Sequence, residues 1–150
     1  MVKLKRSDWL LLLLYDPESE IPHSLDPIRI QKAMFYFAQQ ASVPDSEKYE
    51  FVPYHYGPCS FAIYRDIDAL VAAGLVGPVP VIGQAWSKYR LTEAGIERAK
   101  NLSTNADAQP MKVCSSARER VLRHSFRSLL REVYEQYPQF ATKSVLDKLP

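Results

Sequence analysis

Cysteine, glycine and net charge are all scarce in this sequence of 150 residues. It has five glycines and two cysteines, Cys59 and Cys114. Two isolated thiols cannot build the disulfide framework of a small secreted protein, and neither has a partner at metal-ligand spacing. The net charge of +2 does not by itself require a polyanionic partner. We therefore expect a protein of a reducing, cytoplasmic compartment, with no metal or other cofactor.

Long apolar runs are also lacking. The run from Trp9 to Tyr15 is far too short to cross a bilayer. Asp8 interrupts the basic residues before it and no small-residue cleavage site follows, so the pattern is not typical of a signal peptide. We expect a buried helix here, capped by Ser7 or Asp8, and no membrane partner.

The rest of the chain predicts a mainly helical α+β protein. Asp26-Pro27 is a typical helix start, and the helix that follows should bury Ile30, Met34 and Phe37 while Lys32 points elsewhere. Residues 49–52 are compatible with a short strand.

A third helix should begin at the N-cap Ser60 and end at Gly74. Residues 75–82 and 85–91 are two extended runs joined by Gly83-Gln84, which predicts a hairpin. Thr92 should cap a further helix. Residues 103–110 resemble a polar linker, and one long amphipathic helix is expected from about Ser115 to Tyr137.

Three helices followed at once by a hairpin is the order of a winged helix-turn-helix. We therefore expect a winged helix-turn-helix domain over residues 1–104, with a two-stranded β-hairpin wing, and a C-terminal helical extension over residues 105–150 for docking or dimerisation.

Two motifs give this expectation a family context. Residues 89–95, YRLTEAG, resemble the Y-x-L-T-x-x-G signature that follows the wing in many prokaryotic regulators. Residues 28–40 and 51–76 resemble small prokaryotic winged-helix proteins that are distantly similar to the Panacea or SocA-like antitoxin domain. The positions that match this pattern are Arg29, Gln31, Lys32, Tyr56, Gly57, Pro58, Ser60, Tyr64, Asp66, Leu70, Gly74 and Leu75. The resemblance implies a fold and a setting of regulators or antitoxins, and Cys59 stands where the family usually has an aromatic residue.

The stretch YHYGPCS, residues 54–60, has two interpretations. Cys59 could be a nucleophile with His55 as its base, because a thiol before a helix can be activated. Alternatively, Gly57 and Pro58 form a sharp turn, Ser60 caps the helix, and the rings of Tyr54 and Tyr56 pack under helix and wing. We favour the structural interpretation and a non-enzymatic protein. The complete set of residues given a structural role is Tyr54, Tyr56, Gly57, Pro58, Ser60, Tyr64, Asp66, Gly74, Thr92 and Gly95.

The predicted nucleic-acid contacts are dispersed. Outward positions of the third helix are expected to be Ala62, Arg65, Asp66, Ala69 and Ala73, a weak face for DNA, with Asp66 holding a nearby Arg or Tyr. In the C-terminal helix, an apolar stripe should dock on the domain or on a second subunit, beside an arginine stripe that is either solvated or bound to phosphate. The apolar stripe is Val121, Leu122, Phe126, Leu129, Leu130 and Val133. The DNA-binding candidates are Arg65, Gln84, Lys88, Arg90, Arg120, Arg123, Arg127 and Arg131.

These observations lead to two functional hypotheses. The first is a DNA-binding transcriptional regulator, acting as a homodimer through its C-terminal helix. The second is an antitoxin-like or adaptor module that binds a protein partner through the third helix.

Overall fold

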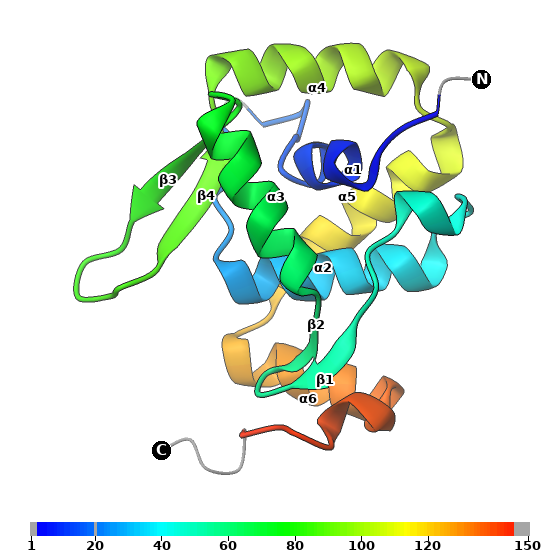
Figure 1. Ribbon diagram of the computed structural model, residues 1–150, viewed down its shortest axis with the longest axis vertical. Coiled ribbons are helices and arrows are strands. Elements are labelled where there is room, and N and C mark those ends of the chain that lie inside the picture. Colours follow the sequence, from blue (N-terminus) through cyan, green and yellow to red (C-terminus); the bar gives the residue numbers. More distant parts are fainter. Residues whose placement is uncertain (1–2, 20, 146–150) are drawn as a thin grey trace.

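The computed structural model describes residues 3–19 and 21–145 and is mainly helical (Figure 1). Over these residues it has six α-helices and two antiparallel two-stranded sheets, which confirms the predicted α+β, mainly α class. The helices are α1 (Arg6–Leu13), α2 (Pro27–Gln40), α3 (Phe61–Ala72), α4 (Glu93–Asn105), α5 (Ala108–Arg123) and α6 (Phe126–Gln136). The strands are β1 (Val52–Tyr54), β2 (Gly57–Cys59), β3 (Val76–Pro80) and β4 (Ser87–Leu91), and short 3₁₀ turns span Asp45–Glu47 and Pro138–Ala141.

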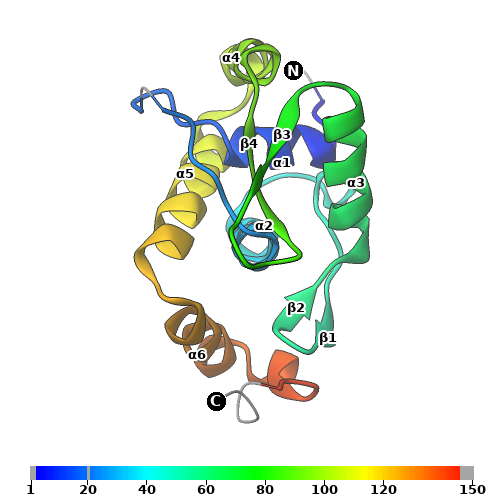
Figure 2. The ribbon, with the colours of Figure 1, turned by 90° about the vertical axis from the view of Figure 1, so that its left-hand side faces the viewer.

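Helix α2 lies at the centre of the molecule. Figure 2 looks along it, with α3 on one side and α5 on the other. Residues 30–37 of α2 are all buried, as are residues 9–14 in and after α1. Because both helices are enclosed on nearly every side, their sequences are apolar over more than one face. No helix in the described part of the chain is long and apolar enough to span a membrane.

The helix starts follow local side-chain chemistry. Asp26 Oδ1 accepts a hydrogen bond from the Arg29 amide at 2.8 Å, so the predicted Asp26-Pro27 start is confirmed. Helix α1 begins two or three residues earlier than predicted, so neither Ser7 nor Asp8 is its N-cap. Its N-cap is Lys5, and Asp8 accepts from the Lys5 amide at 2.9 Å from within the first turn.

The β3–β4 hairpin follows α3 as predicted. Its register pairs Val76 with Leu91 and Pro80 with Ser87, and Leu25 pairs with Tyr89 at the other edge of β4. Gly74 has φ +77° just after α3, which confirms the left-handed position there.

Thr92 and Gly95 join this hairpin to α4. The Thr92 hydroxyl accepts from the Gly95 amide at 3.0 Å and donates to the Gly74 carbonyl at 2.7 Å. A Cβ on residue 95 would lie 1.9 Å from the Leu75 carbonyl oxygen, so the close approach of α4 requires glycine. The Y-x-L-T-x-x-G pattern therefore has a physical explanation in this chain.

The C-terminal third departs from prediction. Residues 103–110 are not a linker, because only Ala106 and Asp107 separate α4 from α5. The single helix predicted from Ser115 to Tyr137 is wrong, since α5 ends at Arg123 and α6 starts after Ser125.

Local and long-range hydrogen bonds explain this break. The Ser125 hydroxyl accepts from the Ser128 amide at 3.2 Å and so caps α6. The Arg29 guanidinium donates to the carbonyls of Val121 (3.0 Å) and His124 (2.7 Å), which satisfies the end of α5 from outside the helix.

Helices α5 and α6 share the core of the preceding residues. Val121, Leu129, Leu130 and Val133 of the predicted apolar stripe are fully buried within the chain, whereas Leu122 is 40% exposed. Of the two predicted roles for this stripe, the structure shows docking on the chain's own domain.

Candidate interaction surface

Two polar side chains of α2 hold the start of α3 in place. Gln31 Nε2 donates to the Ser60 carbonyl at 2.9 Å, and Gln31 Oε1 accepts from the Ser60 amide at 2.8 Å. Lys32 Nζ donates to the Pro58 carbonyl at 2.8 Å. Gln31 and Lys32 are each almost completely buried. The prediction that Lys32 points away from the core is wrong, because its ammonium serves a backbone carbonyl that would otherwise be unpaired.

Ser60 is the N-cap residue of α3, but its side chain makes no capping hydrogen bond. The backbone amide and carbonyl of Ser60 are instead bonded by the side chain of Gln31, which lies 29 residues earlier in the chain. The expectation that the Ser60 hydroxyl caps the helix is therefore wrong. Gly57 has φ +86° between β1 and β2, which confirms the sharp turn predicted there.

The immediate surroundings of Cys59 do not activate its thiol. Cys59 is buried, and burial raises the pKa of its thiol despite the nearby Lys32 ammonium. The His55 ring lies parallel to the Tyr54 ring, with centroids 4.3 Å apart. The geometry thus supports the structural interpretation of residues 54–60.

An apolar groove lies where the N-terminus of α2, the β1–β2 turn, α3, the β3–β4 loop and the start of α6 come together. Its volume is about 570 Å³, which is within the range of ligand-binding pockets. We call it the aromatic groove, and it is lined by Asp26, Pro27, Ile28, Arg29, Tyr56, Tyr64, Trp86 and Phe126.

The two charged residues in this groove are already used within the protein. Arg29 binds Asp26 as well as the two carbonyls at the end of α5. Tyr56 packs edge-on against Phe126, with ring centroids 5.4 Å apart, rather than beneath the β3–β4 hairpin as predicted. What the groove offers a ligand is therefore mainly apolar and aromatic surface.

Further apolar side chains are exposed on the adjoining surface. Trp86 is 43% exposed, Tyr64 40% and Phe61 47%. Phe61 meets Tyr54 edge to face at 5.2 Å, and Tyr54 is itself exposed rather than packed under a helix as predicted. Ile82 in the β3–β4 loop is completely exposed. Such a concentration of apolar surface is typical of interaction sites.

The outward face of α3 differs in detail from the prediction. Ala62 and Asp66 are only partly exposed, and Phe61, Tyr64 and Asp68 are exposed instead. The Tyr49 hydroxyl donates to Asp66 Oδ2 at 2.6 Å, which confirms the expected tyrosine partner of this carboxylate. Arg65 is exposed as predicted.

The predicted arginine stripe is not continuous. Arg120 Nε donates to Glu132 Oε1 at 3.0 Å, and its guanidinium lies over the Tyr36 ring at 4.1 Å. Arg120 is therefore unsuited to phosphate contact. Arg123 and Arg131 are exposed but belong to different helices, and Arg127 is partly buried. In the hairpin, Gln84 and Arg90 are exposed and Lys88 is partly buried.

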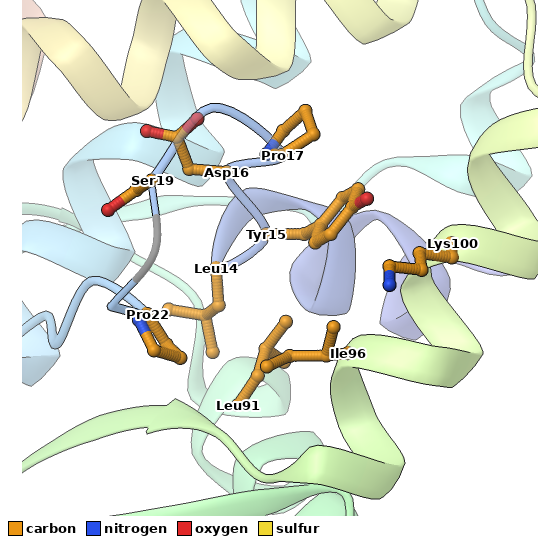
Figure 3. Close-up of a pocket in the computed structure, with 9 residues that line it drawn as sticks. All are labelled: Leu14, Tyr15, Asp16, Pro17, Ser19, Pro22, Leu91, Ile96 and Lys100. Carbon is orange, nitrogen blue, oxygen red and sulfur yellow. The ribbon is translucent and has the colours of Figure 1, made fainter.

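A smaller cavity lies apart from the aromatic groove (Figure 3). It measures about 230 Å³ between the loop after α1, the end of β4 and one face of α4. Figure 3 shows Leu14, Leu91 and Ile96 along its apolar side, with Lys100 beside Tyr15. Asp16 in its wall binds His23 at 2.8 Å and is not free for a ligand. Among the described residues, no group of His, Cys, Asp and Glu side chains is placed to hold a metal ion.

Comparisons with known proteins do not assign this chain to a family. No family model matches it, and no curated protein matches it.

Proposed function

We propose that this protein is a non-enzymatic interaction module of the winged helix-turn-helix type that binds a protein partner through α3 and the β3–β4 hairpin. The hairpin would be the wing, and α3 the third helix of the unit. The aromatic groove and the exposed Tyr64 and Trp86 support this proposal most directly. Proteins commonly bind each other through aromatic side chains that lose water on contact.

The face of α3 favours a protein over duplex DNA. Helices that read a major groove present mainly cations and amides to base edges and phosphates. Here the exposed positions include Phe61 and Tyr64, with Asp68 opposing the charge of Arg65. A carboxylate and two exposed rings are poorly suited to a phosphate backbone but are well suited to a protein surface.

Site-specific photo-crosslinking in living cells tests the proposal. A photo-reactive phenylalanine derivative replaces Ile82, which is fully exposed in the β3–β4 loop. The matched control places it at Glu97 on α4, at the end of the molecule away from β1 and β2 (Figure 1). We expect a discrete crosslinked protein with the probe at Ile82 and not at Glu97. Equal crosslinking at both positions, or none at Ile82, would reject the proposal.

DNA binding is the second candidate function. It is supported by exposed cations, since Arg65, Arg90 and Arg123 are all accessible. Anisotropy titration with labelled mixed-sequence duplex at low and moderate salt tests it. If DNA is bound, Arg123→Ala with Arg127→Ala should weaken binding and flatten its salt dependence. No binding at low salt would exclude this function.

The remaining expectations stay as proposals. A cytoplasmic location rests on the two thiols, both of which are free rather than joined in a disulfide. A homodimer and a relation to antitoxin-like proteins rest on the sequence patterns alone.

A further inference from the structure

We propose that the aromatic groove takes a short acidic segment of the partner, with one or more large apolar side chains entering the groove and Asp or Glu side chains at its rim. This inference rests on the proposed function and specifies the chemistry of the partner. It follows from two independent features, the lining of the groove and the charge of the elements around it.

The lining requires apolar groups. Four of the eight lining residues are aromatic, and Pro27 and Ile28 add aliphatic surface. The remaining two, Asp26 and Arg29, are bonded to each other at 2.6 Å. A charged ligand group that entered the groove would lose its water without gaining a free charged partner there, which is costly. Large apolar side chains would instead lose only unfavourable contact with water.

The residues around the groove favour a ligand that carries negative charge. The segments that build the groove are residues 26–29, 51–72, 76–91 and 121–128. Together they carry six Lys/Arg and three Asp/Glu, a net charge of +3, while all other residues carry thirteen and fourteen, a net charge of −1.

Asp26 and Arg29 are bound to each other, so this pair adds no net charge, whereas Asp66 accepts from the neutral Tyr49 hydroxyl and keeps its charge. Without Asp26 and Arg29 the segments carry five Lys/Arg and two Asp/Glu, a net charge of +3. Arg65 follows Tyr64 directly and Lys88 is two residues beyond Trp86, while Asp68 is an exposed carboxylate on the same helix as Tyr64. An anionic segment would thus find complementary charge beside the groove.

A single-stranded nucleic acid is the other polyanion that such a surface could attract, since bases stack on aromatic rings. Sequence-specific binding of bases also uses hydrogen bonds to their edges. The charged lining residues Asp26 and Arg29 are engaged within the protein, and Tyr56 and Phe126 already pack against each other. Amino-acid side chains without polar atoms fit this lining better than bases do.

Selection from a random twelve-residue peptide library displayed on phage tests the inference, with the full chain as bait. We expect enriched peptides that combine Trp, Phe or Leu with Asp or Glu. Trp86→Ala should weaken the selected peptides by about thirtyfold, as for a central interface tryptophan. Arg65→Glu with Lys88→Glu should weaken them by about tenfold. Arg98→Glu, a charge reversal on the exposed surface of α4, is the matched control and should have no effect.

The alternative results separate this inference from the proposed function. Enriched peptides that are basic, or whose binding is unchanged by Trp86→Ala, would overturn the acidic segment while crosslinking at Ile82 could still support a protein partner. No enriched peptide together with a crosslinked partner would show that the contact is not a short segment. Binding of labelled oligo(dT) that is lost in Trp86→Ala would assign the groove to single-stranded nucleic acid instead. Absence of the crosslink would reject the proposed function itself.

Discussion

Replacing Lys32 by methionine should change how the stability of the protein depends on pH, because it removes a buried charge together with the donor to the Pro58 carbonyl. Lys32 is 2% exposed, and removal from water lowers the pKa of its ammonium from 10.5 to about 8. The neighbouring Cys59 and Asp26 act in the opposite direction but do not offset this effect. The charged ammonium is therefore less stable in the folded protein than in the unfolded chain, and its burial lowers the free energy of unfolding.

The sign of the effect follows from proton binding. Between pH 8 and pH 10.5 the unfolded chain binds more protons at Lys32 than the folded chain, so the free energy of unfolding rises with pH. Below pH 8 the full cost of burying the charge is present. Since one pKa unit corresponds to about 1.4 kcal/mol, the total is about 3 kcal/mol. Most of it, between about 2 and 3 kcal/mol, should be recovered from pH 7 to pH 10.

The assay is urea unfolding followed by far-UV circular dichroism at a series of pH values. Burial also raises the pKa of Tyr36 to about 12, above its value of about 10 in the unfolded chain, and this effect is present in both proteins. The quantity to compare is therefore the difference in unfolding free energy between wild type and Lys32→Met.

Relative to the variant, wild type should gain between about 2 and 3 kcal/mol from pH 7 to pH 10. Lys100→Met, which removes an exposed lysine from α4, is the control and should leave the difference from wild type flat. A flat difference for Lys32→Met as well would refute the argument from burial.

Three further predictions concern Gly95, Gln31 and Cys59, which position the elements around the candidate interaction surface. Gly95→Ala should destabilise the protein by roughly 2 to 3 kcal/mol in thermal or urea unfolding, although alanine favours helices, because its Cβ would clash with the Leu75 carbonyl. Gly77→Ala is the control and should be tolerated, since its Cβ would lie 3.7 Å from the nearest side chain. Gln31→Ala should cost roughly 2 to 4 kcal/mol by leaving the Ser60 amide and carbonyl unpaired, while Gln39→Ala on the exposed side of α2 should cost almost nothing; equal costs would contradict the assigned hydrogen bonds. Cys59→Ala should lose about 1 kcal/mol of stability. The thiols of folded wild type should react slowly with a disulfide reagent, because burial raises the pKa of both Cys59 and Cys114. Rapid reaction of the native protein would contradict this expectation.

Features that depend on nearby residues could be predicted from the sequence. The helix start at Asp26, the left-handed Gly74 and the cap at Thr92 each involve atoms within a few residues of one another. The β3–β4 hairpin is similar, because its two runs are adjacent in the chain and a glycine marks the loop between them.

The break between α5 and α6 could not be predicted in this way. The helical pattern of apolar residues continues across His124 and Ser125, so periodicity predicts a single helix there. The decisive donor is Arg29, which lies more than 90 positions earlier and binds the carbonyls at the end of α5. Arg120 belongs to the predicted DNA-binding stripe, but in the folded chain Glu132, on the next helix, and Tyr36, on α2, hold it.

In the candidate site too, the side chains whose surroundings come from remote segments are the ones that the sequence pattern placed wrongly. The resemblance to a family pattern drew attention to Gln31 and Lys32, but periodicity placed Lys32 in solvent. Conversely, the Tyr54 ring was expected to pack under helix and wing, whereas it is 39% exposed.

By itself, the sequence determined where α2, α3, α4 and the β3–β4 hairpin begin, because caps, turns and periodicity are short-range properties. Only the tertiary structure decided which polar side chains are buried and which aromatic rings remain exposed. Whether a charge can be buried depends on the donors and acceptors that remote segments bring to it, and the Lys32 ammonium is buried where β2 presents the Pro58 carbonyl to it.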